Sequence, residues 1–448
     1  MTILRTLALL GALSTFPASA ASAAEEPLTL AGAMQRAREN AREVGAARAR
    51  LEAAEARVSQ AKGFRLPSIN LTELWTRTNN PAEVFALKLN QGTFSFPDFV
   101  QSDPNSPVPV NAGITRGEIA LPLFTGGELS GRINQAKLAA EAAARNVDWV
   151  GNSAALAGAE AYVMVAQAEE YAALLTKARE TVAAHVALAR SYVEQGMLVR
   201  SELLRAEVEL ARVQDLVQEA EGRVRVANAN LAFRLGAPED ATWQLTPLPE
   251  PRAVGSPLET WLTSAASRPD LASARKLLAA GELEEKVRKA PLWPKLAFVA
   301  RGELYGEHAF GSSGTSGALL AVATWNVFSG GADRAAAAAA RAEARAGRED
   351  VTRFAEGVRV EVRQAYEEAE TSRARAETAR KALEAARESE RITTDRFRSG
   401  VVKMLDLLDA TTARREAETR ELVARAEANA ALLRLAVKAG RRPESVLP

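Results

Sequence analysis

The chain has 448 residues, of which 57 are Lys or Arg and 56 are Asp or Glu, so its formal net charge is +1. A protein that coats nucleic acid needs a large positive excess, so this balance argues against a nucleic-acid partner. The chain has no cysteine, which excludes disulfides, thiolate metal sites and cysteine nucleophiles. The two histidines, His185 and His308, are far apart in the sequence. We therefore expect neither a cofactor nor a metal site.

The N-terminal residues have the pattern of a secretory signal peptide. Arg5 precedes an apolar stretch from Leu7 to Phe16, and Ala-Ser-Ala at 21–23 provides a cleavage site. We predict a signal peptide over residues 1–23; a buried N-terminal helix is the alternative. No later stretch has the ~18 uninterrupted apolar residues that a membrane helix requires.

The rest of the chain contains two copies of one plan. Gly196 and Gly400 lie 204 residues apart (400 − 196). The same offset aligns LFTGG at 123–127 with VFSGG at 327–331, Tyr162 with Tyr366, and Gly236 with Gly440. A constant offset over such different residues indicates an internal repeat. We predict a first repeat over 24–240, a Pro-rich linker over 241–256 and a second repeat over 257–448.

Each repeat has the same predicted elements in chain order: a helix, two extended strands, a very long helix and a shorter returning helix. In the first repeat they lie at about 31–62, 66–78, 114–124, 128–194 and 199–235. In the second they lie at about 257–288, 293–306, 318–328, 332–398 and 403–438. A helix of about 67 residues is about 100 Å long. We expect each long helix to run from the strands to a glycine turn, with the two shorter helices end to end beside it.

The extended stretches alternate in polarity as strands do. Along 114–124, Ile119, Leu121 and Leu123 share one face, and Glu118, Ala120 and Pro122 share the other. A length of about 10 residues suits a tilted strand that crosses a bilayer. Four strands cannot close a barrel, and an open sheet edge in lipid leaves backbone groups unpaired. The chain must therefore oligomerise: two copies give eight strands with a filled interior, and three give twelve with a pore.

The loop between the first two strands, residues 79–113, is unusually long. Pro67 precedes Phe124 by 57 residues, whereas Pro294 precedes Phe328 by 34, so the first copy has a loop 23 residues longer. The loop contains four aromatic residues, Phe85, Phe94, Phe96 and Phe99. It either lies outside the cell or folds over the mouth of the barrel, and the sequence leaves both alternatives open.

These parts resemble the TolC-like outer-membrane efflux proteins. The resemblance rests on LTLAGAMQRAREN at 28–40, RLPSINL at 65–71, LPLFTGG at 121–127 and SRPDLASAR at 267–275. Its most specific part is SGVVKMLDLLDATT at 399–412, which resembles the periplasmic-tip signature of that family.

The resemblance implies a mainly α-helical protein with a transmembrane β part. Three copies would form a homotrimer with a long antiparallel α-helical barrel in the periplasm. The four strands of each copy would contribute to a 12-stranded β-barrel embedded in outer-membrane lipid. The resemblance also implies two protein partners: a periplasmic adaptor (membrane fusion) protein and an inner-membrane pump of the RND, ABC or MFS type.

The turns at Gly196 and Gly400 are the first candidate site. A glycine at a helix end supplies the left-handed conformation that reverses the chain, and apolar residues at an exposed turn indicate an interaction surface. We predict docking of the adaptor at Gly196, Leu198, Gly400, Val402, Leu405 and Asp406. The alternative is that these apolar residues pack the short helix against its own long neighbour, which we favour for Leu204 and Leu408.

A second candidate site is a gate above the turn at Gly400. The resemblance implies that acidic residues surround a constriction near the tips, and Glu388, Arg391, Asp395 and Arg398 lie in the last turns of the long helix. They are candidates for inter-helix ion pairs that hold a closed state. The alternative, which the sequence alone favours, is a solvated helical face.

We expect a passive exit duct of a tripartite efflux or type I secretion system, located in the outer membrane with a periplasmic helical tunnel. The alternative is a periplasmic coiled-coil scaffold or adaptor without membrane insertion, which would leave the strand pairs without a role. No nucleophile, base and acid occur in a catalytic pattern, so we do not expect an enzyme. The sequence does not indicate the transported substrate.

Overall fold

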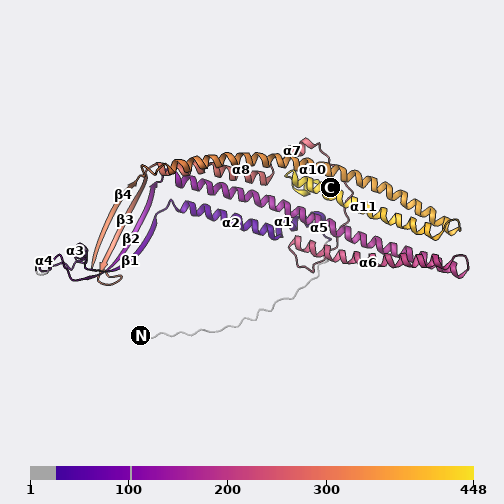
Figure 1. Ribbon diagram of the computed structural model, residues 1–448, viewed down its shortest axis with the longest axis horizontal. Helices are drawn as coiled ribbons and strands as arrows, with labels where there is room; N and C mark the ends of the chain where they lie inside the picture. The colour runs from indigo at the N-terminus through magenta and orange to yellow at the C-terminus, as the bar shows by residue number, and fades with distance from the viewer. Residues whose placement is uncertain (1–26, 101–102, 448) are drawn as a thin grey trace, which may run out of the picture.

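The computed structural model describes residues 27–100 and 103–447. The predicted signal peptide lies outside this part of the chain. The molecule is elongated, with a β-sheet towards one end and long helices that extend from it to two hairpin turns at the other end (Figure 1). The described chain ends at residue 447, part-way along the helices (Figure 1). The predicted class, mainly helical with a few antiparallel strands, is confirmed.

The first repeat contains the helices α1 (Leu30–Asn40), α2 (Arg42–Gly63), α3 (Pro81–Asn90), α4 (Phe96–Val100), α5 (Glu128–Glu194) and α6 (Arg200–Leu235). The second contains α7 (Leu258–Ala265), α8 (Pro269–Glu282), α9 (Glu284–Lys289), α10 (Ala332–Arg398) and α11 (Met404–Lys438), with 3₁₀ turns η1 (Ala290–Leu292) and η2 (Pro443–Val446). Both long helices, α5 and α10, have 67 residues and the predicted bounds.

The predicted continuous helices over 31–62 and 257–288 are wrong at equivalent points. α1 ends at Asn40, where Gly236, at the end of α6, abuts the chain: a Cβ on Gly236 would lie 2.5 Å from the Asn40 carbonyl oxygen. In the second repeat Arg268 is extended (ψ 131°), because a residue that precedes proline avoids the helical conformation. Gly440 abuts Arg268 in the same way. Each returning helix, α6 or α11, therefore ends against the break in the helical segment that opens its own repeat.

The sheet contains four antiparallel strands in the order β1 (Ser68–Thr78), β2 (Val110–Phe124), β3 (Lys295–Gly306) and β4 (Gly314–Thr324). The strand predicted over 318–328 lies four residues too far along the chain, since β4 spans Gly314–Thr324. β4 ends at Thr324 because this residue pairs with Lys295, the first residue of β3, and the residues after Thr324 have no partner in β3. β2 begins at Val110 rather than 114, because its first residues pair with the end of β1 at Thr78.

The two faces of the sheet differ in chemistry. On the polar face, Arg116 pairs with Glu303 at 2.6 Å and Arg301 pairs with Glu118 at 3.0 Å, in both cases across β2 and β3. The opposite, apolar face exposes large side chains from all four strands, among them Ile69, Leu71, Ile119, Phe298 and Leu319. The alternation predicted for β2 is confirmed.

The long loop 79–113 contains the helix α3, although no helix was predicted there. Its start follows simple capping rules: the side chain of Asn80 accepts hydrogen bonds from the backbone N–H groups of Ala82 and Glu83, and Pro81 occupies the first helical position. The Asn-Pro signal was therefore available in the sequence.

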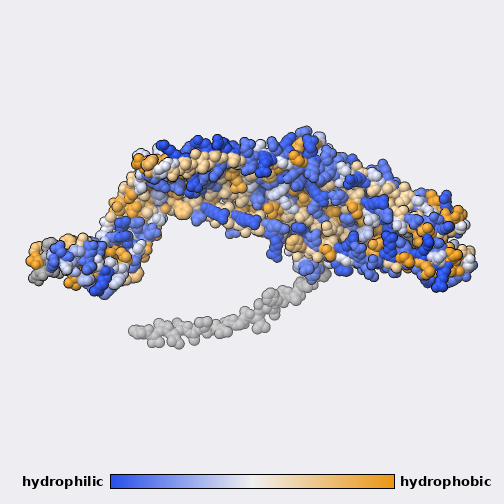
Figure 2. All heavy atoms as spheres, in the orientation of Figure 1, coloured by the Kyte–Doolittle hydropathy of each residue, from blue (hydrophilic) through white to orange (hydrophobic). Residues whose placement is uncertain are grey.

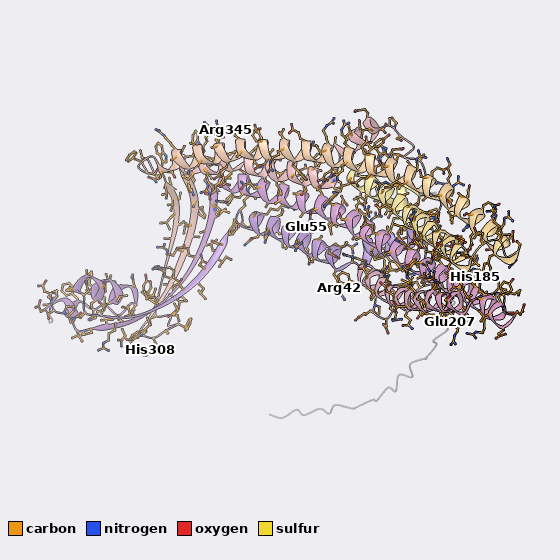
Figure 3. All side chains as sticks on the ribbon, turned by 45° about the vertical axis from the view of Figure 1, so that its right-hand side comes forward. Arg42, Glu55, His185, Glu207, His308 and Arg345 are labelled. Atoms are coloured by element: carbon orange, nitrogen blue, oxygen red, sulfur yellow. The ribbon has the colours of Figure 1, made fainter. Side chains whose placement is uncertain are left out.

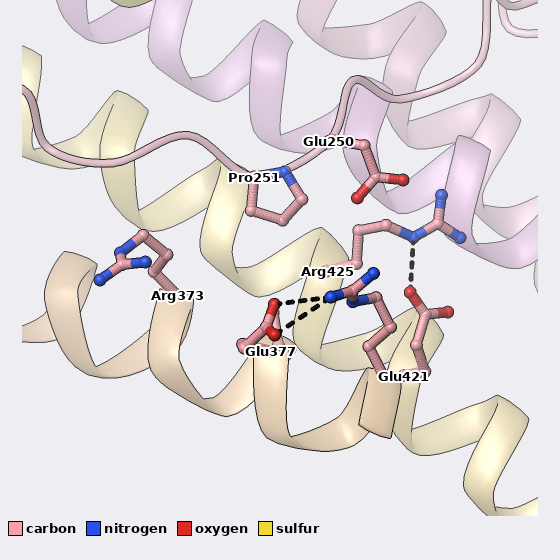
Figure 4. Close-up of a pocket in the computed structure, with 8 residues that line it drawn as sticks. Glu250, Pro251, Arg373, Glu377, Glu421 and Arg425 are labelled. Atoms are coloured by element: carbon pink, nitrogen blue, oxygen red, sulfur yellow. Dashed lines mark hydrogen bonds and ion pairs between the residues drawn. The ribbon is translucent and has the colours of Figure 1, made fainter. Parts of the chain in front are cut away.

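The linker between the repeats contains neither helix nor strand, and it lies across the middle of the helices. Leu28 forms an isolated bridge with Leu245, and the buried Tyr162 hydroxyl donates to the backbone oxygens of Leu28 (3.0 Å) and Thr246 (2.6 Å). Further along, Glu250 and Pro251 lie over charged side chains of α10 and α11 (Figure 4). The linker thus ties the start of α1 to the long helix α5.

Candidate functional site

The two helical hairpins reverse at glycines. Gly196 and Gly400 both have φ +73°, a conformation that residues with a Cβ rarely adopt. After Gly400 the backbone N–H of Val401 donates to the Arg396 carbonyl, which satisfies an acceptor at the end of α10. The left-handed backbone of one glycine therefore allows the chain to reverse at each turn.

The two turns of one chain pack against each other and form a single unit, here called the tip. Its buried core combines Val186, Ala189 and Ala206 of the first hairpin with Phe397, Met404, Leu407 and Leu408 of the second. The rings of Tyr192 and Phe397 are stacked, with centroids 6.0 Å apart. Leu198, Leu203 and Val402, which lie near the two glycines, pack against this core.

The predicted docking residues occupy different positions at the tip. Leu198 and Val402 are half-buried against the core, whereas Leu405 is 42% exposed. Leu408 is buried, as predicted. Leu204 is 49% exposed, so the prediction that it packs against its own long helix is wrong; Leu203, one residue earlier, contacts the core instead.

Asp406 stabilises the start of α11. It is the third residue of that helix, and its carboxylate accepts a hydrogen bond from the Lys403 backbone N–H at 2.9 Å. The carboxylate also lies near the positive end of the helix dipole. A capping role therefore accounts for this residue without reference to a partner.

Large apolar side chains remain exposed around both turns: Met197, Val199, Val401 and Leu405. Figure 2 shows apolar residues at the tip end of the molecule, among hydrophilic ones. These side chains do not belong to the tip core. They form a surface at the end of the molecule that is farthest from the sheet (Figure 1).

Three of the four candidate gate residues lie together on an exposed face of α10. Arg391 pairs with Glu388 at 2.7 Å and with Asp395 at 3.2 Å, within the same helix. The hydrogen bonds with Arg391 lower the pKa of Glu388, and those with Glu388 raise the pKa of Arg391. Arg398 makes none of these pairs within the described residues. The ion pairs of this face thus lie within one helix in the single chain.

Two ion pairs that connect the helices near the tip were not predicted from the sequence. Glu390 of α10 pairs with Arg414 of α11 at 3.0 Å, and Glu209 of α6 pairs with Arg415 of α11 at 2.9 Å. All four side chains are mostly buried. One sequence contains no signal for such pairs, because the partners are remote along the chain.

His185 lies between the hairpins near the tip (Figure 3). Its Nε2 is 3.4 Å from the Thr411 hydroxyl of α11. Burial lowers the pKa of His185, and the positive charges of Arg398 and Arg414 lower it further. The histidine is therefore neutral at pH 7, in a position where a positive charge is unfavourable.

A profile of the outer membrane efflux protein family matches residues 33–237 and 263–441, which is most of the chain. This chain belongs to the outer membrane efflux protein family. The predicted resemblance is thereby confirmed. No curated protein sequence matches the chain. In the part of this family member that the structure describes, every helix is too short or too polar to cross a membrane.

Solved structures of outer-membrane channels share the fold of this efflux-family chain. The channel OprN is 20% identical, with a TM-score of 0.75, over 92% of this chain and 89% of that one. VceC from Vibrio cholerae is 18% identical, with a TM-score of 0.75, over 92% and 96% of the two chains. CmeC from Campylobacter jejuni is 14% identical, with a TM-score of 0.76, over 92% and 85%.

Proposed function

We propose that this chain is the outer-membrane exit duct of a tripartite efflux or type I secretion system. Three copies form a homotrimer with a 12-stranded barrel in the outer membrane and a helical tunnel in the periplasm. Substrates enter the duct from an inner-membrane pump of the RND, ABC or MFS type, through a periplasmic adaptor. The duct conducts them passively, and the pump supplies the energy.

The observation that carries this proposal is the four-stranded sheet. Within residues 27–100 and 103–447, β1 and β4 are edge strands, each with a neighbour on one side only. One face of the sheet is apolar and exposed. An apolar sheet in lipid must pair its edges, because the bilayer offers no other hydrogen-bond partners. Copies of the same chain supply matching edges, which supports a closed barrel made from several chains.

The polar face of the sheet has the chemistry expected for the interior of the proposed barrel. In a membrane barrel the side chains alternate between lipid and interior, so the face opposite the apolar one lines the pore. The cross-strand pairs Arg116–Glu303 and Glu118–Arg301 lie on that face. A soluble scaffold or adaptor would have no use for a sheet with one exposed apolar face.

The tip supports docking of the adaptor. It lies farthest from the membrane-facing strands (Figure 1), and Met197, Val199, Val401 and Leu405 remain exposed there. Leu198 and Val402 contribute from the edge of the tip core. Apolar groups on an exposed turn are stabilised when a partner covers them.

Arg391 and its partners support a gate at the tunnel entrance. Because Glu388 and Asp395 are exposed in one chain, copies of this face that approach a threefold axis bring their carboxylates together. Asp395→Ala is then expected to raise the single-channel conductance and to weaken block by divalent cations in planar bilayers. Unchanged conductance and unchanged block would exclude Asp395 from the gate.

Two measurements test the proposed duct. The full-length protein is expected in the outer-membrane fraction, soluble only with detergent, with the mass of three chains in light scattering. The purified trimer is expected to conduct ions in planar bilayers. Recovery as a salt-soluble periplasmic monomer would falsify the proposal and favour a scaffold or adaptor.

A further inference from the structure

We infer that α3 forms an apolar constriction inside the outer mouth of the barrel. This inference rests on the proposed function, because it requires a pore. α3 lies beyond the strand ends that are farthest from the long helices (Figure 1). Because only the polar face of the sheet borders the lumen, α3 can narrow the pore only if it covers that face.

The contacts of α3 place it on the polar face. Leu87 packs against Ala112, Ile114 and Tyr305. These three share the face of Arg116 and Glu303. Side chains alternate between the two faces of a strand, so the even-numbered residues of β2 and the odd-numbered residues of β3 lie on this face. Gly314 lies opposite Tyr305, and a Cβ there would lie 1.8 Å from the Asn90 carbonyl oxygen at the end of α3. Only glycine allows this approach.

α3 is held firmly in this position. Gln91, directly after the helix, is 3% exposed, and its amide nitrogen donates to the backbone oxygens of Asn111 (2.9 Å) and Gly306 (2.9 Å). One side chain thus joins α3 to the ends of both β2 and β3. Val84 and Leu87 are buried beneath the helix. The helix is a fixed part of the polar face.

The turn between β3 and β4 folds onto the apolar face of the sheet, opposite to α3. Gly113 is on the apolar face, and a Cβ there would lie 2.1 Å from the His308 carbonyl oxygen. The backbone N–H of Phe310 donates to Glu73, another residue of the apolar face, at 3.0 Å. At the same end of the sheet, α3 therefore lies on the polar face and the turn that contains His308 lies on the apolar face.

The side of α3 that is directed away from the sheet is also apolar. Ala82, Phe85, Ala86 and Leu89 follow the i, i+3, i+4, i+7 spacing of one helical face, and Leu89 is 49% exposed. On the polar face of a barrel this stripe is directed into the pore. Three copies place three such stripes around the mouth, and an apolar constriction resists the passage of hydrated ions by dewetting. Apolar and amphiphilic solutes cross it more readily.

The natural absence of cysteine permits a direct test. Trimers of Leu89→Cys and His308→Cys are placed in planar bilayers and treated with a cationic methanethiosulfonate reagent, and incorporation of the label is measured by mass. Labelling at Leu89→Cys is expected to change the conductance about twofold or more, because it places charge in a narrow apolar passage. Labelling at His308→Cys, on the outer side, is expected to leave it unchanged.

A second variant, Leu89→Ser, is expected to raise the conductance without any reagent, since Leu89 is half-exposed and contributes little to folding. A conducting trimer that incorporates the label at Leu89→Cys with no change in conductance would overturn the constriction alone. A wild-type trimer that does not conduct would overturn the proposed duct and this inference together.

Discussion

At the scale of single residues, the backbone conformation of glycine decides where the long helices reverse. Gly400 has φ +73°, and within the described structure a Cβ there would meet no atom within 4 Å. Space is therefore available for a side chain, and the cost of replacing this glycine comes only from the left-handed backbone.

Gly400→Ala is accordingly expected to lower the free energy of unfolding by about 1 kcal/mol per chain, the cost of the left-handed conformation for a residue with a Cβ. Gly400→Asn should lower the free energy of unfolding by less, because asparagine tolerates the left-handed conformation. Denaturant unfolding of the detergent-solubilised protein measures both. Gly357, in the interior of α10, is the matched control: Gly357→Ala should stabilise the helix. Equal effects at the two positions would contradict the explanation.

His185 predicts a pH dependence at the tip. Its ordinary pKa is about 6.5, and burial together with Arg398 and Arg414 lowers the pKa in the folded protein. The unfolded chain therefore binds the proton more readily below pH 6.5, so stability is greatest above this pH and falls as the pH decreases through the folded-state pKa.

Hydrogen exchange at the tip is compared between pH 7.5 and pH 5.5, ~two pH units that span the ordinary titration of histidine. After correction for the intrinsic exchange rates, exchange is expected to be faster at the lower pH. His185→Gln should remove most of this difference. His308→Gln, at the other end of the molecule, should retain it. A wild-type tip with the same protection at both pH values would contradict the role of His185.

At the scale of elements, the break before α8 is stabilised by a buried arginine. Arg268 is 2% exposed; it pairs with Asp270 at 2.7 Å and with Glu361 of α10 at 2.9 Å, and it lies over the ring of Trp149 of α5. It also donates to the Lys438 carbonyl at the end of α11. One side chain thus joins four helices where the returning helix ends.

Arg268→Ala is expected to destabilise the protein by about 1–3 kcal/mol, because it leaves the mostly buried Asp270 carboxylate without its charged partner, whereas the half-exposed Glu361 retains Lys438. Arg268→Lys should recover only part of this loss, since lysine cannot form the bidentate pair with Asp270. Thermal unfolding compares these variants. Arg391→Ala, at an exposed ion pair, should leave the unfolding midpoint nearly unchanged, and a similar shift for Arg391 and Arg268 would contradict this account.

The same elements show what could be predicted locally. The bounds of α5 and α10 follow from Gly-Gly pairs and from the turn glycines, which are local signals. The break before Pro269 also had a local signal. The break at Ala41 had none, because the carbonyl of Asn40 meets Gly236, nearly 200 residues later (236 − 40 = 196). Tertiary contact decided that boundary.

At the scale of the whole molecule, the single chain leaves apolar surface exposed along its helices. A groove of about 700 Å³ between α5, α6 and α11 is lined by Met164, Val226 and Val423. Val226 is 71% exposed. Together with the open edges of the sheet, this exposed apolar surface supports the proposed homotrimer, with copies in contact along the helices as well as through the strands.

Val226→Asp is therefore expected to reduce the fraction of trimer, because it places a charge in an apolar interface. Light scattering in detergent measures the mass of the assembly at several protein concentrations. Val226→Ile, which keeps the apolar surface, should retain the trimer. Full trimer formation by Val226→Asp would show that this groove is not part of the interface.

The sequence by itself determined the repeat, the long helices, the turn glycines and the alternating strand faces, because helical and strand periods and the left-handed requirement of glycine act over a few residues. Only the tertiary structure decided how the two turns join in one tip, that Glu390 and Glu209 bind arginines of α11, and that α3 lies on the polar face. These features depend on partners that are distant in sequence, and no local pattern specifies which distant surface a segment will meet.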